Sequence, residues 1–503
     1  MKFQSPTEDQ SIEYPHLRRS KTVEGAVNTL DWLLVALILA LVFRAFAVEA
    51  FQIPTGSMAE TLKGAHWHLR CLRCGKSYDF GGDSEVLLRP ECPMCKMIQP
   101  PGAVGVLANG DRIFVNKCIY QFSEPKRWDV VVFKNPPNPQ ENYIKRLIGL
   151  PGEQIEIREG DIYINGQIAR KPRKVQDQLW MCVYHQDYPP AEISRFEAED
   201  IEEQGSALSA RKGAFENEGS SRWDLSSEAP SAMLLNEEDP MEHRLVFMPP
   251  HSDTFRTTYA YNDRYANMNK PICSDLMIRF WIEPQTEAGM AAALLEKDGI
   301  RYIGRFDFFG QLVLERQTEE GNRQTLRKLS FRPDLARGGI WFEFANVDHR
   351  LVIRCGDYRL SYDLNPDDRR NPLQDLDRHN PEVKILGSGK VRLRHVGLYR
   401  DIYYLSNDSL RARPDKPFQL RPDEFFVCGD NSPNSFDSRQ WPATGVGNNQ
   451  KQYRPGVVPR DFLMGKAFFV YWSDAFRPRE SMMPVIPNLE KLRVICGGSD
   501  EMY

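Results

Sequence analysis

The stretch that decides the fold is residues 141–152, ENYIKRLIGLPG. It is typical of a β-strand that is ended by a Pro-Gly pair. Alternation along a strand places Tyr143, Lys145 and Leu147 on one face. A lysine between an aromatic ring and a leucine is desolvated, and desolvation favours the neutral amine. Lys145 is therefore a candidate general base, and an ordinary edge-strand lysine is the alternative interpretation.

A candidate nucleophile lies in residues 51–58, FQIPTGSM. Pro54 and Gly56 interrupt regular structure, so we expect Ser57 in a turn. The nine histidines are scattered along the chain, and none stands in a motif with an acidic partner, which argues against a Ser-His-Asp arrangement. A neutral lysine can instead take the proton of a serine hydroxyl. Ser57 and Lys145 therefore form a candidate pair of nucleophile and base.

A third segment, residues 429–439 (GDNSPNSFDSR), has the composition of a loop whose side chains bond to the backbone. Asp437 and Arg439 can brace one another within it. Loops this rich in hydrogen-bonding groups commonly hold a site in place. The predicted supporting residues are Gly429, Asp430, Asn431, Asn434, Asp437, Ser438 and Arg439.

These segments belong to a series of blocks that resembles bacterial type I signal peptidase. The blocks occur in the family's order at residues 54–58, 110–115, 128–133, 143–152 and 429–439, and residues 465–473 are similar to the family's last strand. The resemblance implies a serine endopeptidase with a mostly antiparallel β catalytic domain and no cofactor for catalysis. Its expected partners are exported preproteins, whose signal peptides it removes after small residues of the Ala-x-Ala kind, and the lipid bilayer.

The resemblance also implies roles for single residues. Ser57 would be the nucleophile and Lys145 the general base. Ser435 would orient Lys145 by a hydrogen bond, and the Ser57 backbone N–H with the Thr55 hydroxyl would form the oxyanion hole. The chain departs from the family where it has threonine at 55, Ser432-Pro433 in place of Arg-Asp, and Pro442 after Trp441 in place of glycine. These departures concern the bonding of the loop and leave the Ser57–Lys145 pair intact.

A signal peptide's small-residue cleavage site implies shallow apolar pockets beside the nucleophile. The candidates are apolar residues next to the motifs, and each could equally be plain core. They are Phe51, Ile53, Met58, Tyr143 and Ile144.

An apolar segment precedes the nucleophile. Residues 26–48 carry only Asp31 and Arg44 as charges, although the uncharged run 32–43 is shorter than a full membrane span. Arg18, Arg19 and Lys21 precede it, so we expect a single-pass anchor in the cytoplasmic membrane, with residues 1–25 in the cytoplasm and the catalytic domain on the outer face. A cleaved signal peptide and a buried core helix are the alternatives.

Four cysteines form a C-x₂-C-x₁₇-C-x₂-C pattern. This spacing is typical of a zinc ribbon, in which four thiolates hold a structural Zn²⁺. Disulfides are the alternative, because the module would lie outside the cytoplasmic membrane. The predicted ligands are Cys71, Cys74, Cys92 and Cys95.

A large insertion follows the catalytic strand. Its first part is acidic, notably residues 197–203, and is typical of a linker. From residue 243, short strand candidates at 276–282, 310–316, 340–344, 350–354 and 391–399 predict a β-sandwich, similar in rhythm to concanavalin or laminin-G jelly rolls. A binding or spacer role and no separable role both remain open, and a glycan or a protein is its candidate ligand.

The whole chain of 503 residues is thus expected to be mainly β: an antiparallel peptidase domain on a transmembrane helix, interrupted by a zinc ribbon and a β-sandwich. The net charge of −4 gives no general basic field, so nucleic acid is not an expected partner. The alternative function is a membrane-tethered binding protein that displays the two inserted modules.

The expected boundaries are a tail at 1–25, an anchor at 26–48, a peptidase domain at 49–65, 103–172 and 421–485, a ribbon at 66–102, a linker at 173–242, a sandwich at 243–420 and a tail at 486–503.

Overall fold

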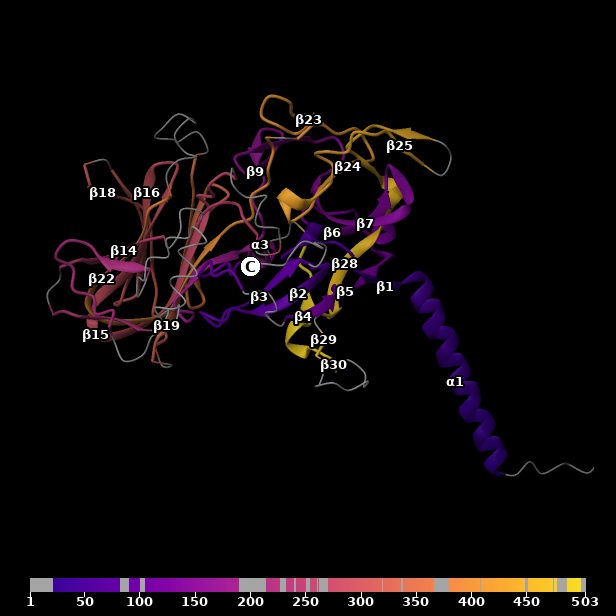
Figure 1. The fold of residues 1–503 in the computed structure, drawn as a ribbon, viewed down its shortest axis with the longest axis horizontal. Coiled ribbons are helices and arrows are strands. Elements are labelled where there is room, and N and C mark those ends of the chain that lie inside the picture. The colour runs from indigo at the N-terminus through magenta and orange to yellow at the C-terminus, as the bar shows by residue number, and fades with distance from the viewer. Residues whose placement is uncertain are drawn as a thin grey trace, which may run out of the picture.

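The structure is a computed structural model of the chain. It describes residues 21–81, 90–99, 105–189, 214–226, 232–238, 241–249, 254–259, 261, 270–318, 320–335, 338–365, 380–407, 409–447, 451–473, 475–476 and 486–498. The described part of the chain is mainly β, as expected. In Figure 1 the β-strands form two bodies side by side, and one long helix projects from one of them.

The first body is built on an eight-stranded sheet of order β1-β5-β28-β6-β7-β24-β27, to which β31 adds by pairing with β28. Its strands are β1 (Val48–Gln52), β5 (Arg112–Asn116), β6 (Val130–Asn135), β7 (Asn138–Gly149), β24 (Glu424–Cys428), β27 (Val458–Pro459), β28 (Leu463–Trp472) and β31 (Arg493–Val494). Successive side chains of β6 enter different cores, because Val130 and Val132 pack in one cluster and Val131 and Phe133 in another. The sheet is therefore covered on both faces.

Smaller elements complete this body. A four-stranded sheet has the order β10-β9-β8-β23. Its strands are β8 (Gln154–Arg158), β9 (Asp161–Ile164), β10 (Gln167–Ile168) and β23 (Phe418–Gln419). The other elements are α2 (Ile119–Phe122), α3 (Arg173–Leu179), β25 (Gly445–Val446), β26 (Gln452–Tyr453), β29 (Ala475–Phe476), β30 (Ile486–Pro487) and the 3₁₀-helices η1 (Gly56–Met58), η4 (Ser432–Asn434), η5 (Arg460–Phe462) and η6 (Leu489–Lys491).

The four-cysteine module is a three-stranded sheet of order β3-β2-β4. Its strands are β2 (Ala65–Arg70), β3 (Ser77–Gly81) and β4 (Val106–Asn109). Cys182 and Tyr188 from the start of the large insertion pack against its cysteine cluster. The module therefore contacts the large insertion as well as the peptidase sheet that it interrupts.

The second body is a network of twelve strands with one large core. Its strands are β11 (Met181–His185), β12 (Phe215–Asn217), β13 (Ala232–Asn236), β14 (His243–Phe247), β15 (Leu276–Lys297), β16 (Ile300–Asp307), β17 (Gln311–Gln317), β18 (Arg323–Ser330), β19 (Ile340–Val347), β20 (Arg350–Cys355), β21 (Tyr358–Asp363) and β22 (Val383–Arg400). The two long strands run through it: β15 pairs with β19 in its first half, with β16 in its second half, and with β22 along both.

The sequence pattern explains this core. Leu276, Ile278, Phe280 and Ile282 alternate with partly exposed or outward residues, and all four are fully buried in the core. At the tight turn from β15 to β16, Asp298 and Gly299 both have positive φ (52° and 77°), as a two-residue hairpin requires. Four of the five strand candidates predicted in this insertion lie within observed strands, and the fifth, 310–316, begins one residue before β17.

Two expected boundaries differ from the observed elements. The segment 173–242, expected as a linker, contributes α3, β11, β12 and β13. All three strands join the twelve-stranded network, β12 by pairing with β14, and β11 and β13 by pairing with β22. Its acidic residues 197–203 lie outside the described residues. Composition indicated a linker, but the apolar side chains of Phe215 and Met233 are buried in the core.

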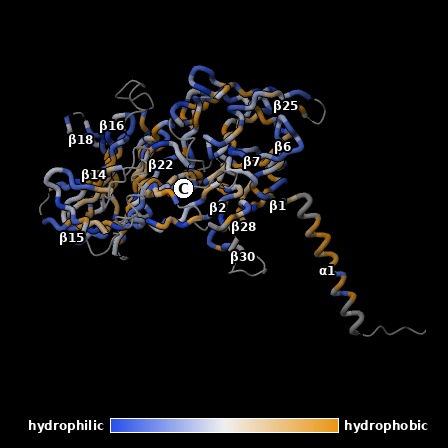
Figure 2. Tube along the Cα trace, viewed as in Figure 1, coloured by the Kyte–Doolittle hydropathy of each residue, from blue (hydrophilic) through white to orange (hydrophobic). Residues whose placement is uncertain are grey.

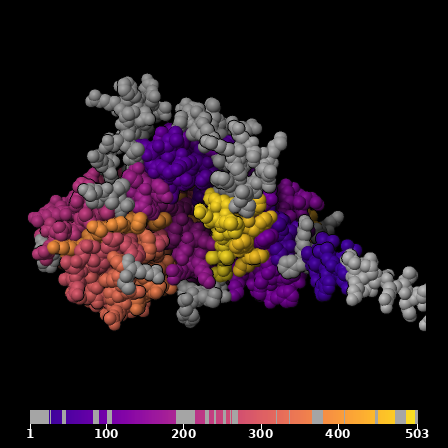
Figure 3. Space-filling model, turned by 90° about the horizontal axis from the view of Figure 1, so that it is seen from below, coloured from indigo at the N-terminus to yellow at the C-terminus, as the bar shows by residue number. Residues whose placement is uncertain are grey.

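The segment 486–503, expected as a tail, also packs against the protein. β31 pairs with β28, and Ile495 is buried. Arg493 donates to the Asp111 carboxylate at 2.7 Å and to the carbonyl of Thr61 at 2.8 Å. Figure 3 shows residues near the C-terminus, in yellow, lying in the middle of one face of the molecule.

The long helix is α1 (Lys21–Phe46). It projects away from both bodies, and its middle is apolar (Figure 2). Within the residues that the structure describes, no helix has both the length and the apolar character needed to cross a membrane. The side chains of residues 42–46 lie outside the described part, and the tail 1–20 does too.

Candidate active site

Ser57 lies in η1, five residues after the end of β1. The segment between β1 and Ser57 is tied to the neighbouring chain, because the backbone N–H of Ile53 donates to the carbonyl of Asp111 at 2.8 Å. The residue before η1, Thr55, is extended and exposed, and its side chain makes no capping hydrogen bond. Ser57 is 9% exposed. The expected turn is thus present, with the serine side chain almost completely buried and the threonine side chain exposed.

Lys145 lies on β7 between β6 and β24, opposite Val131. Its Nζ is 2.6 Å from the Oγ of Ser57, although 88 residues separate them in the chain. The side chain is 4% exposed, and Tyr143 and Leu147 belong to the same core, as alternation predicted. Burial lowers the pKa of Lys145 from 10.5 to about 8, although the carboxylate of Asp437 opposes the shift. The amine can therefore be neutral near physiological pH.

The loop after β24 is organised by Asp437. Its carboxylate accepts from the backbone N–H of Gly429 at 2.9 Å, from the hydroxyl of Ser435 at 2.7 Å and from the guanidinium of Arg439 at 2.7 and 2.8 Å. All four residues are buried. Burial alone would raise the pKa of Asp437, but Arg439 holds it below its ordinary value. The predicted bracing of Asp437 by Arg439 is therefore confirmed.

The same loop is tied to the serine turn by Asn431. Its Nδ2 donates to the carbonyl of Gly56 at 2.9 Å, and its backbone N–H donates to the carbonyl of Ser57 at 3.1 Å. Two further predicted residues stabilise the loop itself: the Asn434 N–H donates to the Asn431 carbonyl, and the Ser438 hydroxyl accepts from the Val427 N–H at 3.0 Å. The loop therefore holds the carbonyl groups of Gly56 and Ser57, which belong to the two peptide bonds on either side of the Ser57 Cα.

Ser435 differs from its expected arrangement. The resemblance implied a hydrogen bond from this residue to Lys145, whereas its hydroxyl donates to Asp437. Among the described hydrogen bonds, none joins Ser435 to Lys145. The reason is that the neighbouring carboxylate is charged and is the stronger acceptor. Ser432, where the family has arginine, accepts from Arg439 and from the N–H of Leu405.

The five candidate pocket residues divide into two groups. Ile53 and Met58 are 2% and 0% exposed and belong to the core beneath the serine turn. Phe51 and Ile144 are partly buried against that core, and Tyr143 is partly buried beside Lys145, whose Nζ lies 5.4 Å from the ring centre. Only the second group has surface available to a substrate.

Sequence reasoning missed the ion pair next to Lys145. Arg146 donates to both carboxylate oxygens of Asp430 at 2.7 Å, and the two side chains are 0% and 1% exposed. The pair joins β7 to the supporting loop, so the base and the loop are fixed together. The alternation of the strand assigned Arg146 to the opposite face from Lys145, but no local pattern identified Asp430 as its partner.

The four cysteines come together as predicted. Their sulfur atoms all lie within 4.8 Å of one another, and all four residues are buried. The Sγ of Cys71 is 3.5 Å from that of Cys95, and the Sγ of Cys74 is 3.7 Å from that of Cys92. These separations are too long for disulfides, which need about 2.05 Å, and fit the roughly 3.8 Å between ligands 2.3 Å from a tetrahedral zinc. The cluster is therefore compatible with a structural zinc ion.

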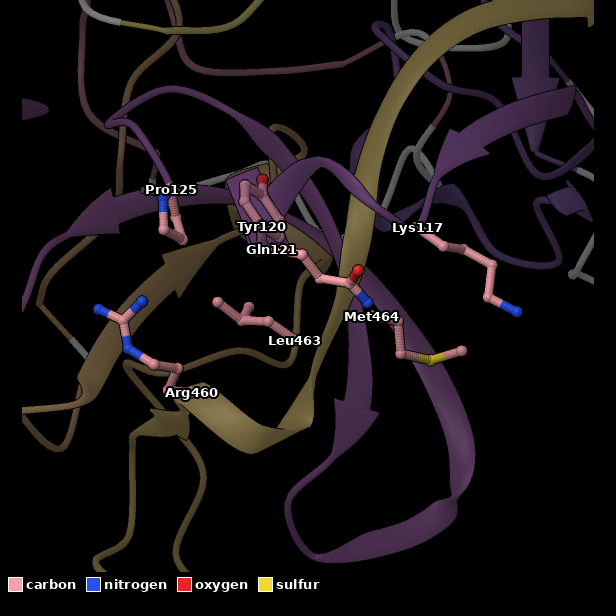
Figure 4. Close-up of a pocket in the computed structure, with 7 residues that line it drawn as sticks. All are labelled: Lys117, Tyr120, Gln121, Pro125, Arg460, Leu463 and Met464. Carbon is pink, nitrogen blue, oxygen red and sulfur yellow. The ribbon is translucent and has the colours of Figure 1, made fainter. Parts of the chain in front are cut away.

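A separate hollow lies on the peptidase body, and Figure 4 shows its lining. It has a volume of about 400 Å³. The lining residues are Lys117, Tyr120, Gln121, Pro125, Arg460, Leu463 and Met464. None of these is a predicted site residue, so the hollow is distinct from the Ser57–Lys145 pair.

Comparison with known proteins supports the peptidase assignment. Residues 103–200 and 396–472 match the sequence profile of the signal peptidase family, peptidase S26. This match includes Lys145 and Ser435 and begins after Ser57. Signal peptidase I of Pseudomonas aeruginosa is 32% identical over 135 residues, which are 26% of this chain and 36% of the relative. Signal peptidase I T of Bacillus subtilis is 27% identical over 164 residues, which are 32% of this chain and 61% of the relative.

The chain thus spans between about a third and three fifths of the length of these relatives. Among solved structures, a carbohydrate-binding module CBM66 from Bacillus subtilis aligns with 36% of this chain and 93% of its own length, at 10% identity and a TM-score of 0.24. Sheep galectin-11 aligns with 25% of this chain and 92% of its own length, at 12% identity and a TM-score of 0.19. These scores are too low to carry an argument. The sequence matches are specific, and they show that this part of the chain is similar to type I signal peptidases, with the match to the peptidase S26 profile split into two segments.

Proposed function

We propose that the chain is a serine endopeptidase that removes signal peptides from exported preproteins, with Ser57 as nucleophile and Lys145 as general base. The observation that carries this proposal is the 2.6 Å contact between Lys145 Nζ and Ser57 Oγ in a buried setting that lowers the lysine pKa to about 8. A lysine with that pKa accepts a proton near neutral pH.

In the proposed reaction, Ser57 Oγ attacks the scissile carbonyl while its proton moves to Lys145 Nζ. The carbon–nitrogen bond then breaks, and Lys145 gives the proton to the leaving amine. Water, deprotonated by Lys145, next hydrolyses the acyl-enzyme and regenerates the Ser57 hydroxyl. The Ser57 N–H and the exposed Thr55 hydroxyl would donate to the oxyanion. One such donor is worth about 2.7–4 kcal/mol.

The test is cleavage of a preprotein with an Ala-x-Ala site by the full chain. Ser57→Ala is expected to abolish cleavage, Thr55→Val to lower kcat by about 10²–10³-fold, and Thr55→Ser to retain most activity, because it keeps the hydroxyl. Ser226→Ala, an exposed serine in the large insertion, is the matched control. Unchanged cleavage by Ser57→Ala would end the assignment and leave the binding-protein alternative. The intact hydrogen-bonded pair argues for the enzyme.

We further propose that residues 26–48 anchor the enzyme in the cytoplasmic membrane, with the N-terminus in the cytoplasm and the catalytic domain outside. The support is the exposure of large apolar side chains on α1, together with the basic residues 18, 19 and 21. Examples are Leu30 (68%), Trp32 (76%), Leu33 (63%) and Leu39 (62%). Because β1 begins two residues after α1, the Ser57 turn would lie near the bilayer surface. Removal of residues 1–47 should release the protein from membranes, and retention of the truncated protein would contradict the proposal.

For the four cysteines, we propose a structural Zn²⁺. Support comes from the buried cluster and from its two similar turns, in which the Gly75 N–H donates to the Cys71 carbonyl and the Lys96 N–H to the Cys92 carbonyl. Metal analysis of the purified protein should find about one zinc per chain, and Cys71→Ser should lower that content. Four cysteines that resist alkylation until they are reduced would instead indicate disulfides.

Binding of a ligand by the β-sandwich is a further candidate function. Its support is a partly exposed group of rings on β15, β19 and β22: the ring centres of Trp281 and Trp341 are 5.5 Å apart, and those of Trp341 and His395 are 6.0 Å apart. Aromatic rings with one exposed side are common in ligand surfaces. We propose a glycan or a protein as ligand, and Trp341→Ala should abolish its capture on a glycan array or by a purified partner. Equal binding by the variant would exclude this surface.

A further inference from the structure

A short segment of the large insertion, of which the structure describes residues 254–259 and 261, contacts the catalytic turn and its supporting loop. The segment lies between β14 and β15 and is rooted in the sandwich. Phe255 is 0% exposed in the sandwich core, and its carbonyl accepts from the Cys273 N–H at 2.8 Å. The Thr257 N–H donates to the Pro271 carbonyl at 3.0 Å. The start of the segment therefore has a fixed position relative to the sandwich.

Tyr259 of this segment contacts the supporting loop. Its hydroxyl donates to the backbone carbonyl of Asp430 at 3.2 Å, and the residue is 4% exposed. Asp430 carries the buried ion pair with Arg146, and the next residue, Asn431, holds the carbonyl groups of Gly56 and Ser57. Arg400, at the end of β22, lies 5.2 Å from the Tyr259 ring and donates to the Thr258 carbonyl. Tyr259 is thus fixed from the sandwich side and bonded to the peptidase side.

Tyr261 contacts the serine turn directly. A methyl group built on the Cα of Gly56 would lie 2.0 Å from Cε1 of the Tyr261 ring. Gly56 does not have a positive φ, so the ring, and not the backbone conformation, is what excludes a larger residue there. The Tyr261 hydroxyl donates to the Ala65 carbonyl on β2 at 2.7 Å, and its carbonyl accepts from the Gly81 N–H on β3 at 3.0 Å. The ring is therefore held between the four-cysteine module and the residue before the nucleophile.

We propose that Tyr259 and Tyr261 are positioning residues for the Ser57–Lys145 pair, so that the large insertion is required for full activity. Tyr261 limits movement of the turn that carries Ser57, and Tyr259 limits movement of the loop that is bonded to that turn. A displacement of about 1 Å at a reacting group can cost about 10²-fold in rate. This inference rests on the proposed peptidase function, since it assigns these residues to that site.

The first experiment measures kcat and KM for preprotein cleavage by the full chain. Tyr261→Ala is expected to lower kcat by about 10–100-fold and to change KM by less than about 3-fold, because the substrate surface remains while the nucleophile is misplaced. Tyr261→Phe keeps the ring and should retain activity within about 3-fold. Tyr362→Ala, a partly exposed tyrosine (37%) in the same sandwich, is the matched control. A wild-type kcat for Tyr261→Ala would overturn the inference.

A second experiment tests whether the Tyr261 ring packs directly against Gly56. Gly56→Ala should lose at least about 100-fold in kcat, because its methyl group meets the Tyr261 ring. The double variant Gly56→Ala, Tyr261→Ala should recover about 10-fold relative to Gly56→Ala, since the ring that meets the methyl group is gone. A general loss of folding predicts the opposite, namely a double variant worse than either single one. Absence of recovery would therefore contradict direct packing of Tyr261 on the turn.

Failure of the proposed function can be told apart from failure of this inference. If the wild-type chain cleaves no preprotein, the function is wrong, and hydrogen exchange then tests the positioning alone. The N–H groups of Ala59 and Leu62 donate to the carbonyls of Gly56 and Met58 within the turn. Tyr261→Ala should accelerate their exchange at least about 10-fold, whereas Tyr362→Ala should not. Unchanged exchange in Tyr261→Ala would reject the inference independently of activity.

Discussion

Two buried lysines of this protein lie in opposite surroundings. The side chains of Lys145 and Lys171 are each about 95% buried. Lys145 contacts the Ser57 hydroxyl and has no ion pair among the described residues, and burial lowers its pKa to about 8. Lys171 lies against the carboxylates of Asp348 and Asp401, which raise its pKa above the ordinary value despite burial.

At similar burial, the group that is bonded to the lysine amine decides whether the amine can be neutral near physiological pH. An amine without a carboxylate can release its proton near neutral pH and act as a base, whereas a paired amine stays charged. The Lys171 pairs belong to an ion network between the two bodies, in which Lys297 also pairs with Asp275 and His349 with Asp161. The carboxylates of Asp161, Asp275 and Asp348 lie close enough to resemble a metal site, but Asp348 is already paired with Lys171 and Asp275 with Lys297.

The largest expected effect comes from Lys145→Met. Removal of the base should lower kcat/KM by at least about 10³-fold. Because no carboxylate is left unpaired and the side chain volume is nearly kept, the free energy of unfolding should change by less than about 1.5 kcal/mol. Preprotein cleavage and urea unfolding measure the two quantities, with the exposed Lys416→Met as control. Strong destabilisation would show that this lysine is structural.

Lys171→Met should show the reverse pattern. The substitution leaves Asp348 and Asp401 buried without their cation, so the free energy of unfolding should fall by about 3–5 kcal/mol. The kcat/KM of the folded fraction should stay within about 3-fold of wild type, because Lys171 contacts no residue of the dyad. Urea titration monitored by tryptophan fluorescence measures the first quantity. A stability equal to that of Lys416→Met would contradict the contrast between the two lysines.

The pH dependence of catalysis gives the next effect. Lys145 acts only as the neutral amine, and its lowered pKa is about 8, so kcat/KM should rise with pH through about 8. Two pH units below that value, at about pH 6, kcat/KM should be roughly 100-fold below its plateau. Initial rates between pH 5 and 10, with folding checked at each pH, define the curve. An acidic limb near 10.5 would mean that burial does not lower the pKa of this lysine.

The smallest effect is expected from Tyr143→Leu. The Lys145 Nζ lies 5.4 Å from the Tyr143 ring centre, and a ring at this distance stabilises the ammonium form by about 0.5–1 kcal/mol. Leucine keeps the apolar wall without that attraction, so the acidic limb should move to lower pH by less than about one pH unit. The pH–rate curve of Tyr362→Leu is the control. A limb that moves to higher pH would show that the ring disfavours the charged amine.

Local sequence patterns predicted much of the catalytic site. Pro-Gly punctuation located the end of the strand that carries Lys145, and Pro54 with Gly56 located the Ser57 turn. The pairing of Asp437 with Arg439 followed from their spacing, and the cysteine pattern predicted a cluster that the structure confirms. Each of these features depends on neighbours within a few residues or on a spacing that the chain itself carries. For that reason they can be inferred without knowing the fold.

The tertiary structure alone decided the rest. Strand candidates did not reveal that β15 runs on to Lys297 or that β22 begins at Val383, because long strands that span two halves of a core look like two short ones. Nor did any pattern bring Tyr261 to Gly56, Asp430 to Arg146 or Arg493 to Asp111. These contacts join segments about 200 to 400 residues apart, and only the packing of the cores selects such partners. The sequence therefore determined which groups could do the chemistry, and long-range packing determined how they are held.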